Sequence, residues 1–81
     1  MITKEEVKKL IKQGLPDAEV IVRNDYDDGE HFDAEVASAE FVGLNLVKQH
    51  QVVYRALGDA MHGRIHALAL RTYTLEAWPH K

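Results

Sequence analysis

Cysteine is missing from this 81-residue chain. Without thiols there is no disulfide, and a metal centre would have to use histidine, carboxylates or thiols that a partner supplies. The usual marks of an enzyme are lacking too: there is no nucleophilic cysteine, no glycine-rich phosphate loop and no nucleophile elbow. We therefore do not expect an enzyme.

Long apolar runs are also missing. None approaches the roughly 20 residues that a membrane-spanning helix needs. Residues 1–6, MITKEE, are polar and acidic, unlike a secretory or transit peptide. Only two prolines occur and no stretch is of low complexity, so no linker is visible. We expect one cytoplasmic domain over residues 1–81, with no membrane partner.

Positive charge is in short supply. Ten lysines and arginines stand against 13 acidic residues, for a net charge of −3, which suits a polyanionic partner poorly. The glycines are never three positions apart, so the Gly-x-x-Gly loop with which KH domains clamp a nucleic-acid backbone is absent. Lys48, Arg64 and Arg71 could still form a modest positive patch for a partner, although solvated surface charges are the commoner outcome.

The first element that the sequence predicts is a helix over residues 4–13. Thr3 and Glu6 have the spacing of a capping box. An apolar stripe, typical of a helix that packs on a core, follows at Val7, Leu10 and Ile11. We expect Gly14 to end this helix.

Two strands are predicted next, over residues 18–23 and 31–39, because polar and apolar residues alternate there. The acidic segment 24–30 between them contains a glycine and predicts a loop, so the two strands should form an antiparallel hairpin. The second strand has one apolar face and one polar face, with Phe32, Ala34 and Val36 opposite His31, Asp33 and Glu35.

The second half of the chain predicts a helix, a strand and a short terminal helix. The helical stripe after Gly43 consists of Leu46, His50, Val53, Leu57 and Met61. A break near Lys48 could divide this segment into two helices, and Gly63 ends it. Residues 65–73 predict the third strand, and Thr74 is expected to cap a helix that ends near Trp78.

The expected order of elements is α-β-β-α-(α)-β-α. Because a strand–helix–strand crossover favours parallel pairing, the third strand should lie parallel to the second. The helices should all cover one face of a three-stranded mixed sheet. This arrangement is an α+β domain.

Three segments of this sequence are similar to the BolA family: residues 41–43 (FVG), 47–54 (VKQHQVVY) and 65–70 (IHALAL), the last continuing to Trp78. The resemblance covers nearly the whole chain and is strongest to the small bacterial acid-stress (YrbA-like) branch. It implies a class II KH-like fold, in agreement with the order above. It also implies an adaptor that binds a monothiol glutaredoxin and shares a [2Fe-2S] cluster with it, in iron–sulfur trafficking or in iron and stress regulation.

The resemblance implies a cluster ligand at His66, where the family has a histidine at the start of the last strand. A second ligand, histidine or cysteine, comes in many members from the loop between the first two strands. Here that loop has neither, and His31 at its end is the nearest candidate. Strand alternation alone places His66 with Leu68 and Leu70 and favours a structural histidine there. His31 belongs to the opposite face and can equally be a solvated surface residue.

The lack of cysteine predicts that any such cluster is shared. This chain could hold only a histidine-ligated iron, so the partner's cysteine and a glutathione thiol would hold the other. Histidine ligation raises the reduction potential of a [2Fe-2S] centre and makes it sensitive to protons. Of the remaining histidines, we expect His50 to be packed near Tyr54, and His62 and His80 to be surface residues.

Two other functions are compatible with the sequence. The chain could be a DNA-binding regulator of stress or morphology genes that uses the helix-turn-helix-like segment 43–63. It could also bind the glutaredoxin without any cluster. Without a partner, we expect a monomer or a weak homodimer.

Overall fold

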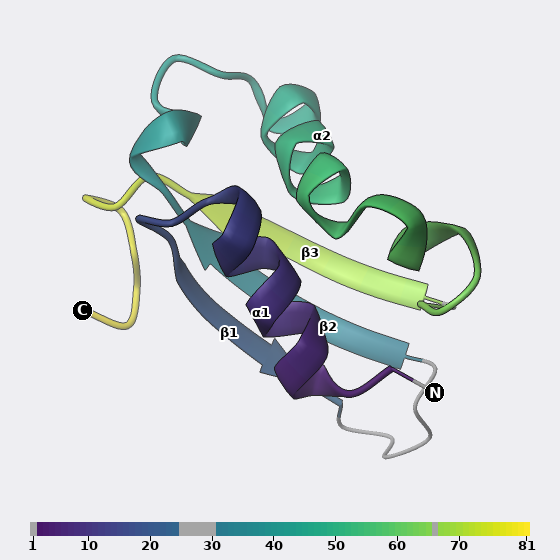
Figure 1. The fold of residues 1–81 in the computed structure, drawn as a ribbon. Coiled ribbons are helices and arrows are strands. Elements are labelled where there is room, and N and C mark those ends of the chain that lie inside the picture. The colour runs from purple at the N-terminus through teal and green to yellow at the C-terminus, as the bar shows by residue number, and fades with distance from the viewer. Residues whose placement is uncertain (1, 25–30, 66) are drawn as a thin grey trace.

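The order of elements agrees with the sequence up to the last strand. The structure, a computed structural model, describes residues 2–24, 31–65 and 67–81. Its elements are α1 (Lys4–Gly14), β1 (Glu19–Arg23), β2 (His31–Ala37), the 3-10 helix η1 (Ala39–Phe41), α2 (Leu46–Leu57), the 3-10 helix η2 (Gly58–His62) and β3 (Ala67–Tyr73). Figure 1 shows α1 and α2 beside a sheet of three strands.

The sheet has the order β1-β2-β3 and mixes the two kinds of pairing, as predicted. β1 and β2 pair in antiparallel fashion with Ile21 opposite Glu35. β2 and β3 pair in parallel, and His31 lies opposite Ala67. Since α2 and η2 form the crossover between β2 and β3, the parallel pairing follows from the general preference for such connections.

α1 begins where the capping box predicts. The Thr3 hydroxyl accepts a hydrogen bond from the Glu6 backbone N–H at 3.1 Å, which satisfies one of the free donors in the first turn. The helix ends one residue later than predicted, and Gly14 is its last residue rather than a stop outside it. A Cβ atom at Gly14 would lie 2.6 Å from Cβ of Ala56. Glycine at this position therefore allows α1 and α2 to approach closely.

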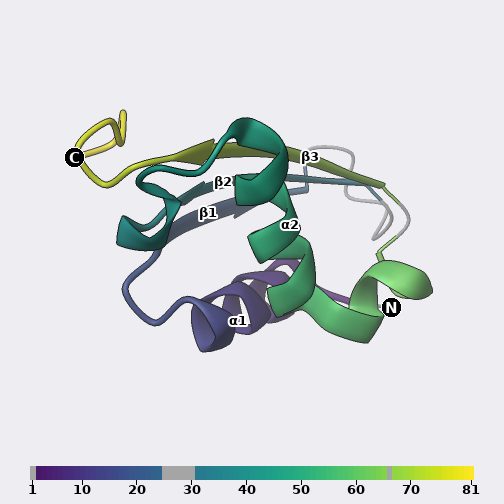
Figure 2. The same cartoon turned by 90° about the horizontal axis from the view of Figure 1, so that it is seen from above.

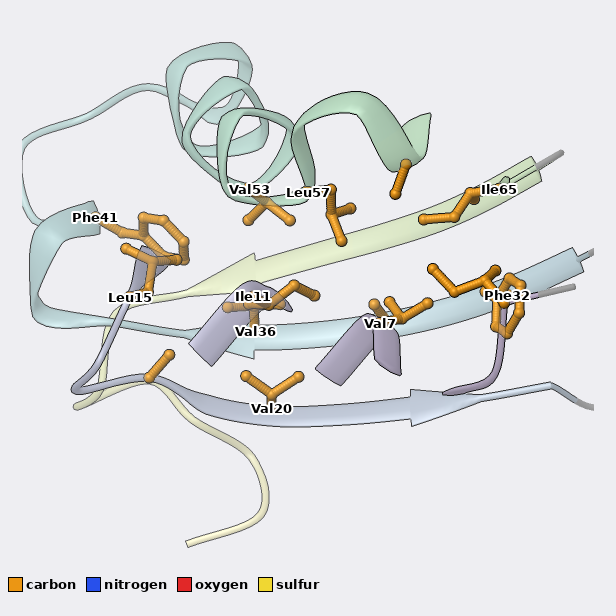
Figure 3. Close-up of a cluster of buried hydrophobic side chains, with 14 residues drawn as sticks. Val7, Ile11, Leu15, Val20, Phe32, Val36, Phe41, Val53, Leu57 and Ile65 are labelled. Atoms are coloured by element: carbon orange, nitrogen blue, oxygen red, sulfur yellow. The ribbon is translucent and has the colours of Figure 1, made fainter. Parts of the chain in front are cut away.

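Both long helices cover the same face of the sheet, as Figure 2 shows. The apolar faces of the helices and strands meet there and form one core, in which Val7, Ile11, Val36, Phe41 and Val53 are completely buried. Figure 3 shows these side chains between the helices and the strands. The predicted alternation in β2 is confirmed, because Phe32, Ala34 and Val36 all belong to this core.

α2 differs in two ways from the helical pattern in the sequence. It is unbroken from Leu46 to Leu57, and the Asn45 side chain caps its start by accepting the Lys48 backbone N–H at 2.9 Å. Leu46, which begins the predicted apolar stripe, is 61% exposed. Val47 is exposed as well, and the buried residues of α2 are Val53 and Leu57, so the predicted stripe is buried only in its later part.

The predicted terminal helix is wrong as well. After β3 the chain forms turns, in which the Thr74 hydroxyl accepts the Ala77 backbone N–H at 3.4 Å. Pro79 stops any helix here before it can complete the costly first turns. Trp78 is instead buried, and its ring lies 5.7 Å from that of Tyr73 in an edge-to-face contact. His80 from this segment contacts Glu35, which lies on the sheet face away from the core.

Candidate functional site

The starts of β2 and β3 lie side by side, although they are far apart in sequence. Their parallel register places His31 opposite Ala67, which follows His66 in the chain. The starts of β2 and β3 therefore lie side by side at one end of the sheet, with His31 in the first position of β2 (Figure 1).

His66 itself lies outside the described residues, so its role as a ligand remains a prediction. His31 is exposed and is the first residue of β2. It lies on the sheet face of Asp33 and Glu35, opposite the buried Phe32, as strand alternation predicts. The role of His31 as a second ligand stays a prediction.

The donor atoms of this chain suit part of an iron–sulfur cluster and not a complete one. The chain has no cysteine. Within residues 2–24, 31–65 and 67–81, no three histidine, aspartate or glutamate side chains are grouped so that they could hold a metal ion. The imidazole of His31, at the start of β2, is therefore compatible with a cluster whose remaining ligands come from elsewhere.

His50 is packed, as the sequence predicts, but it is only half-buried. Its ring lies edge-on to that of Tyr54 with 6.3 Å between the ring centroids. The Nε2 atom of His50 is buried and has no hydrogen-bond partner in the part of the chain that the structure describes. The contact of His50 with Tyr54 is thus between the rings and not a hydrogen bond to its Nε2 atom.

A buried carboxylate on β2 was not recognised in the sequence. Glu35 is only 4% exposed. Its carboxylate oxygens lie 2.7 Å from Arg23 Nη1 and 3.1 Å from His80 Nε2. The Tyr73 hydroxyl lies 3.4 Å from the same carboxylate. The Arg23 guanidinium, with His80 as a further partner, holds the pKa of Glu35 below its ordinary value despite burial.

Glu35 belongs to the polar face of β2, so alternation predicts that it is exposed. It is buried because residues 74–81 fold back over this face and bring His80 to it. His80 is exposed, as the sequence predicts, and its Nε2 atom also contacts Glu35 at 3.1 Å. Local sequence carries no signal for the burial of Glu35 or for its contact with His80, since the two residues are 45 positions apart.

Two of the three cations in the suggested positive patch, Arg64 and Arg71, form ion pairs. Arg64, in the segment that precedes β3 in the sequence, binds Glu6 at 2.7 Å. Arg71 on β3 binds Asp33 on β2 at 3.1 Å. Each arginine is thus neutralised by a different carboxylate. In the described residues, no helix is long and apolar enough to cross a bilayer.

Comparisons with known proteins point to one family. The family model described as BolA-like protein matches residues 11–77. A solved BolA homologue from Coxiella burnetii is 40% identical, with a TM-score of 0.82 over 94% of this chain and 95% of that one. BolA1 from Arabidopsis thaliana is 27% identical, with a TM-score of 0.81 over 98% of this chain and 100% of that one.

A relative whose name states a function matches a shorter part of this chain. The protein named DNA-binding transcriptional regulator BolA in Vibrio cholerae is 44% identical over 48 residues, which are 59% of this chain and 45% of that protein. The matched segment is less than half of that relative.

Proposed function

Because this chain belongs to the BolA family, we propose that it is an adaptor that binds a monothiol glutaredoxin and shares a [2Fe-2S] cluster with it. In this proposal His66 supplies one ligand and His31 is the candidate for a second. The partner's cysteine and a glutathione thiol hold the other iron. The adaptor would serve iron–sulfur trafficking or the regulation of iron and stress responses.

The observation that carries the proposal is the register between β2 and β3. It joins His31 to the residue next to His66, and His31 is exposed to an incoming partner. The absence of cysteine supports a shared cluster over one held by this chain alone. When bound, the cluster would provide a redox-active centre whose histidine ligation depends on pH.

Reconstitution with a partner tests the proposal. The chain is mixed with a monothiol glutaredoxin, glutathione, iron and sulfide, and visible absorption and circular dichroism are recorded. We expect His66→Ala to change the spectrum and to release the cluster more readily. His31→Ala should have a similar effect only if it is the second ligand. His62→Ala, which alters an exposed histidine on η2, is the matched control.

Two results would contradict this function. Spectra of His66→Ala that match those of the wild type would remove His66 from the cluster. Failure to form a complex with the glutaredoxin, measured by size-exclusion chromatography, would reject the adaptor itself. A complex that forms equally well without iron and sulfide, and that shows no cluster spectrum when they are added, would support binding of the partner without a cluster.

DNA binding is the second candidate, and the name of the Vibrio cholerae relative favours it. The net charge of −3 and the neutralised Arg64 and Arg71 argue for weak binding to DNA of arbitrary sequence. Fluorescence anisotropy with duplex DNA at several salt concentrations would decide between the two functions. Several phosphate contacts would give a steep salt dependence, and affinity unchanged in His66→Ala would favour a regulator.

A further inference from the structure

A cleft of about 250 Å³ lies on the flank of α1, beside the segment that leads into β3. It is lined by Glu6, Lys9, Leu10, Gln13 and Arg64. Four of these residues come from three successive turns of α1. Arg64 comes from the segment between η2 and β3. The cleft therefore exists only because the chain before β3 packs against the first helix.

Positive groups dominate this cleft. The Arg64 Nη2 atom binds Glu6 Oε2 at 2.7 Å, which leaves the other N–H groups of this guanidinium available for a second acceptor. The Lys9 ammonium forms no ion pair and the Gln13 amide no hydrogen bond within the described residues. Arginine at this distance lowers the pKa of Glu6, which keeps that carboxylate charged and Arg64 oriented.

The lining also has an apolar part. Leu10 is half-buried and packs against the core, so one side of its side chain contacts the cleft and the other the interior. Lys9 and Gln13 stand one turn apart on the helix and flank it. An acidic residue within a peptide would meet both kinds of surface, because its methylene groups can contact Leu10 while its carboxylate meets the cations.

We propose that this cleft binds a single carboxylate, that of an acidic side chain in a peptide segment of a partner protein. Two cations and one anion line it, so its net charge is +1 and one negative charge balances it. A phosphate, with about two negative charges, would be left unbalanced. A second cleft, of about 230 Å³ and lined by Gly14, Glu40, Val52, Arg55 and Ala56, has one cation and one anion and is therefore neutral.

This site does not depend on the cluster proposal, because none of its residues is a candidate iron ligand. Arg64 nevertheless precedes His66 by two residues in the sequence. A partner that binds at the start of β3 would therefore find the cleft within its reach, and an acidic residue in that partner would gain a charge-assisted hydrogen bond.

Two capped peptides test the proposal on the isolated chain. Both have acetylated and amidated ends, and they differ only in a central glutamate or glutamine between leucines. Backbone amide shifts are followed by NMR during titration. We expect saturable shifts at Lys9, Leu10, Gln13 and Arg64 with the glutamate peptide at millimolar concentrations, and none with the glutamine peptide. Equal shifts with both peptides, or no saturation with the glutamate peptide, would overturn the proposal.

Variants of the chain locate the binding. Lys9→Gln and Arg64→Gln should each lower the affinity for the glutamate peptide by about two- to fivefold, as expected for exposed charge pairs. Lys12→Gln and Arg55→Gln make the same change in net charge outside the cleft and should have no effect. Equal weakening by all four variants would show that only the overall charge matters, which would reject the site.

Glu6→Gln separates binding from structural support. It removes the single negative charge of the cleft and releases Arg64, so we expect tighter binding of the glutamate peptide by about two- to fivefold. If the Glu6–Arg64 pair only holds the fold together, the same substitution would leave binding unchanged or weaken it, and the proposal would fail. Circular dichroism confirms that each variant is folded.

Discussion

Glu35 interacts with three other side chains, which come from β1, β3 and the C-terminal segment. Its carboxylate is buried and is shared by Arg23, His80 and Tyr73. A buried charge is costly unless it is paired and hydrogen-bonded. These partners offset that cost, and they join the edge strand β1 and the C-terminal residues to the central strand.

At the residue scale, we predict that Glu35→Gln destabilises the protein at neutral pH by about 1–3 kcal/mol, because it leaves Arg23 and His80 without their charged acceptor. The folded protein lowers the pKa of Glu35, so the stabilisation is fully present above the unfolded-state pKa and is lost as pH falls through the folded value. Urea unfolding should therefore show a difference between wild type and variant that shrinks from about pH 6 to about pH 3.

The control for this experiment is Glu19→Gln, an exposed carboxylate on β1. It should change the free energy of unfolding by less than about 0.5 kcal/mol at either pH. A constant difference between Glu35→Gln and the wild type across this pH range would contradict the proposed role of the Glu35 charge.

The sequence offered two histidines as candidate ligands, which stay predictions, and it did not indicate the buried carboxylate of Glu35. His66 and His31 were proposed as ligands from resemblance to a family. The polar face of His31 was predicted from alternation, which is a local property of a strand, and is confirmed. The burial of Glu35 depends on His80 and Trp78, which come from a distant segment. Residue type and spacing alone could not indicate it.

At the scale of elements, the contact between α1 and α2 depends on two small residues. Gly14 and Ala56 face each other so closely that no Cβ fits at Gly14 without a shift, since that atom would lie 3.1 Å from the Ala56 Cα as well. Glycine is unfavourable inside a helix, so its presence in the last turn of α1 is explained by packing.

We predict that Gly14→Ala destabilises the protein by about 1–2 kcal/mol, although alanine is the better helix former. The added methyl group would push the two helices apart. The double variant Gly14→Ala, Ala56→Gly should recover most of this loss, because the methyl group is moved from one helix to the other. Chemical unfolding measures both. A stabilised single variant would show that the helices separate without cost.

The elements themselves were largely predictable, and their ends less so. Capping by Thr3 and the alternation in β2 are interactions between residues near in sequence. The failure of the terminal helix after Thr74 has a local cause as well, because Pro79 leaves too few residues for helical hydrogen bonds. Leu46 is different: its apolar character predicts burial, but α2 begins beyond the part of the core that could cover it.

At the scale of the whole molecule, Trp78 packs the C-terminal segment 74–81 against the end of β3. It is 6% exposed and lies between Tyr73 and His80, whose ring centroids are 5.7 and 4.9 Å from its own. The helices cover one face of the sheet, and this segment covers part of the other. A three-stranded sheet in a small domain gains a second, minor packing layer in this way.

We predict that Trp78→Ala lowers the free energy of unfolding by about 2–4 kcal/mol, through lost apolar burial and edge-to-face contacts. Leu75→Ala, in the same segment but 37% exposed, should cost less than about 1 kcal/mol. Unfolding followed by far-UV circular dichroism compares the two. Equal effects would mean that residues 74–81 do not pack as a unit around Trp78.

Local sequence was enough for α1, α2, the three strands and the pairing of the sheet, because helical and strand periodicities arise from neighbours along the chain. The lack of cysteine likewise limited any metal site to histidines and a partner's ligands. The burial of Glu35, the close contact at Gly14, the separate pairing of Arg64 and Arg71 and the cleft beside α1 were not visible there. Each of them depends on which distant segments pack together, and that is settled by the free energy of the complete fold.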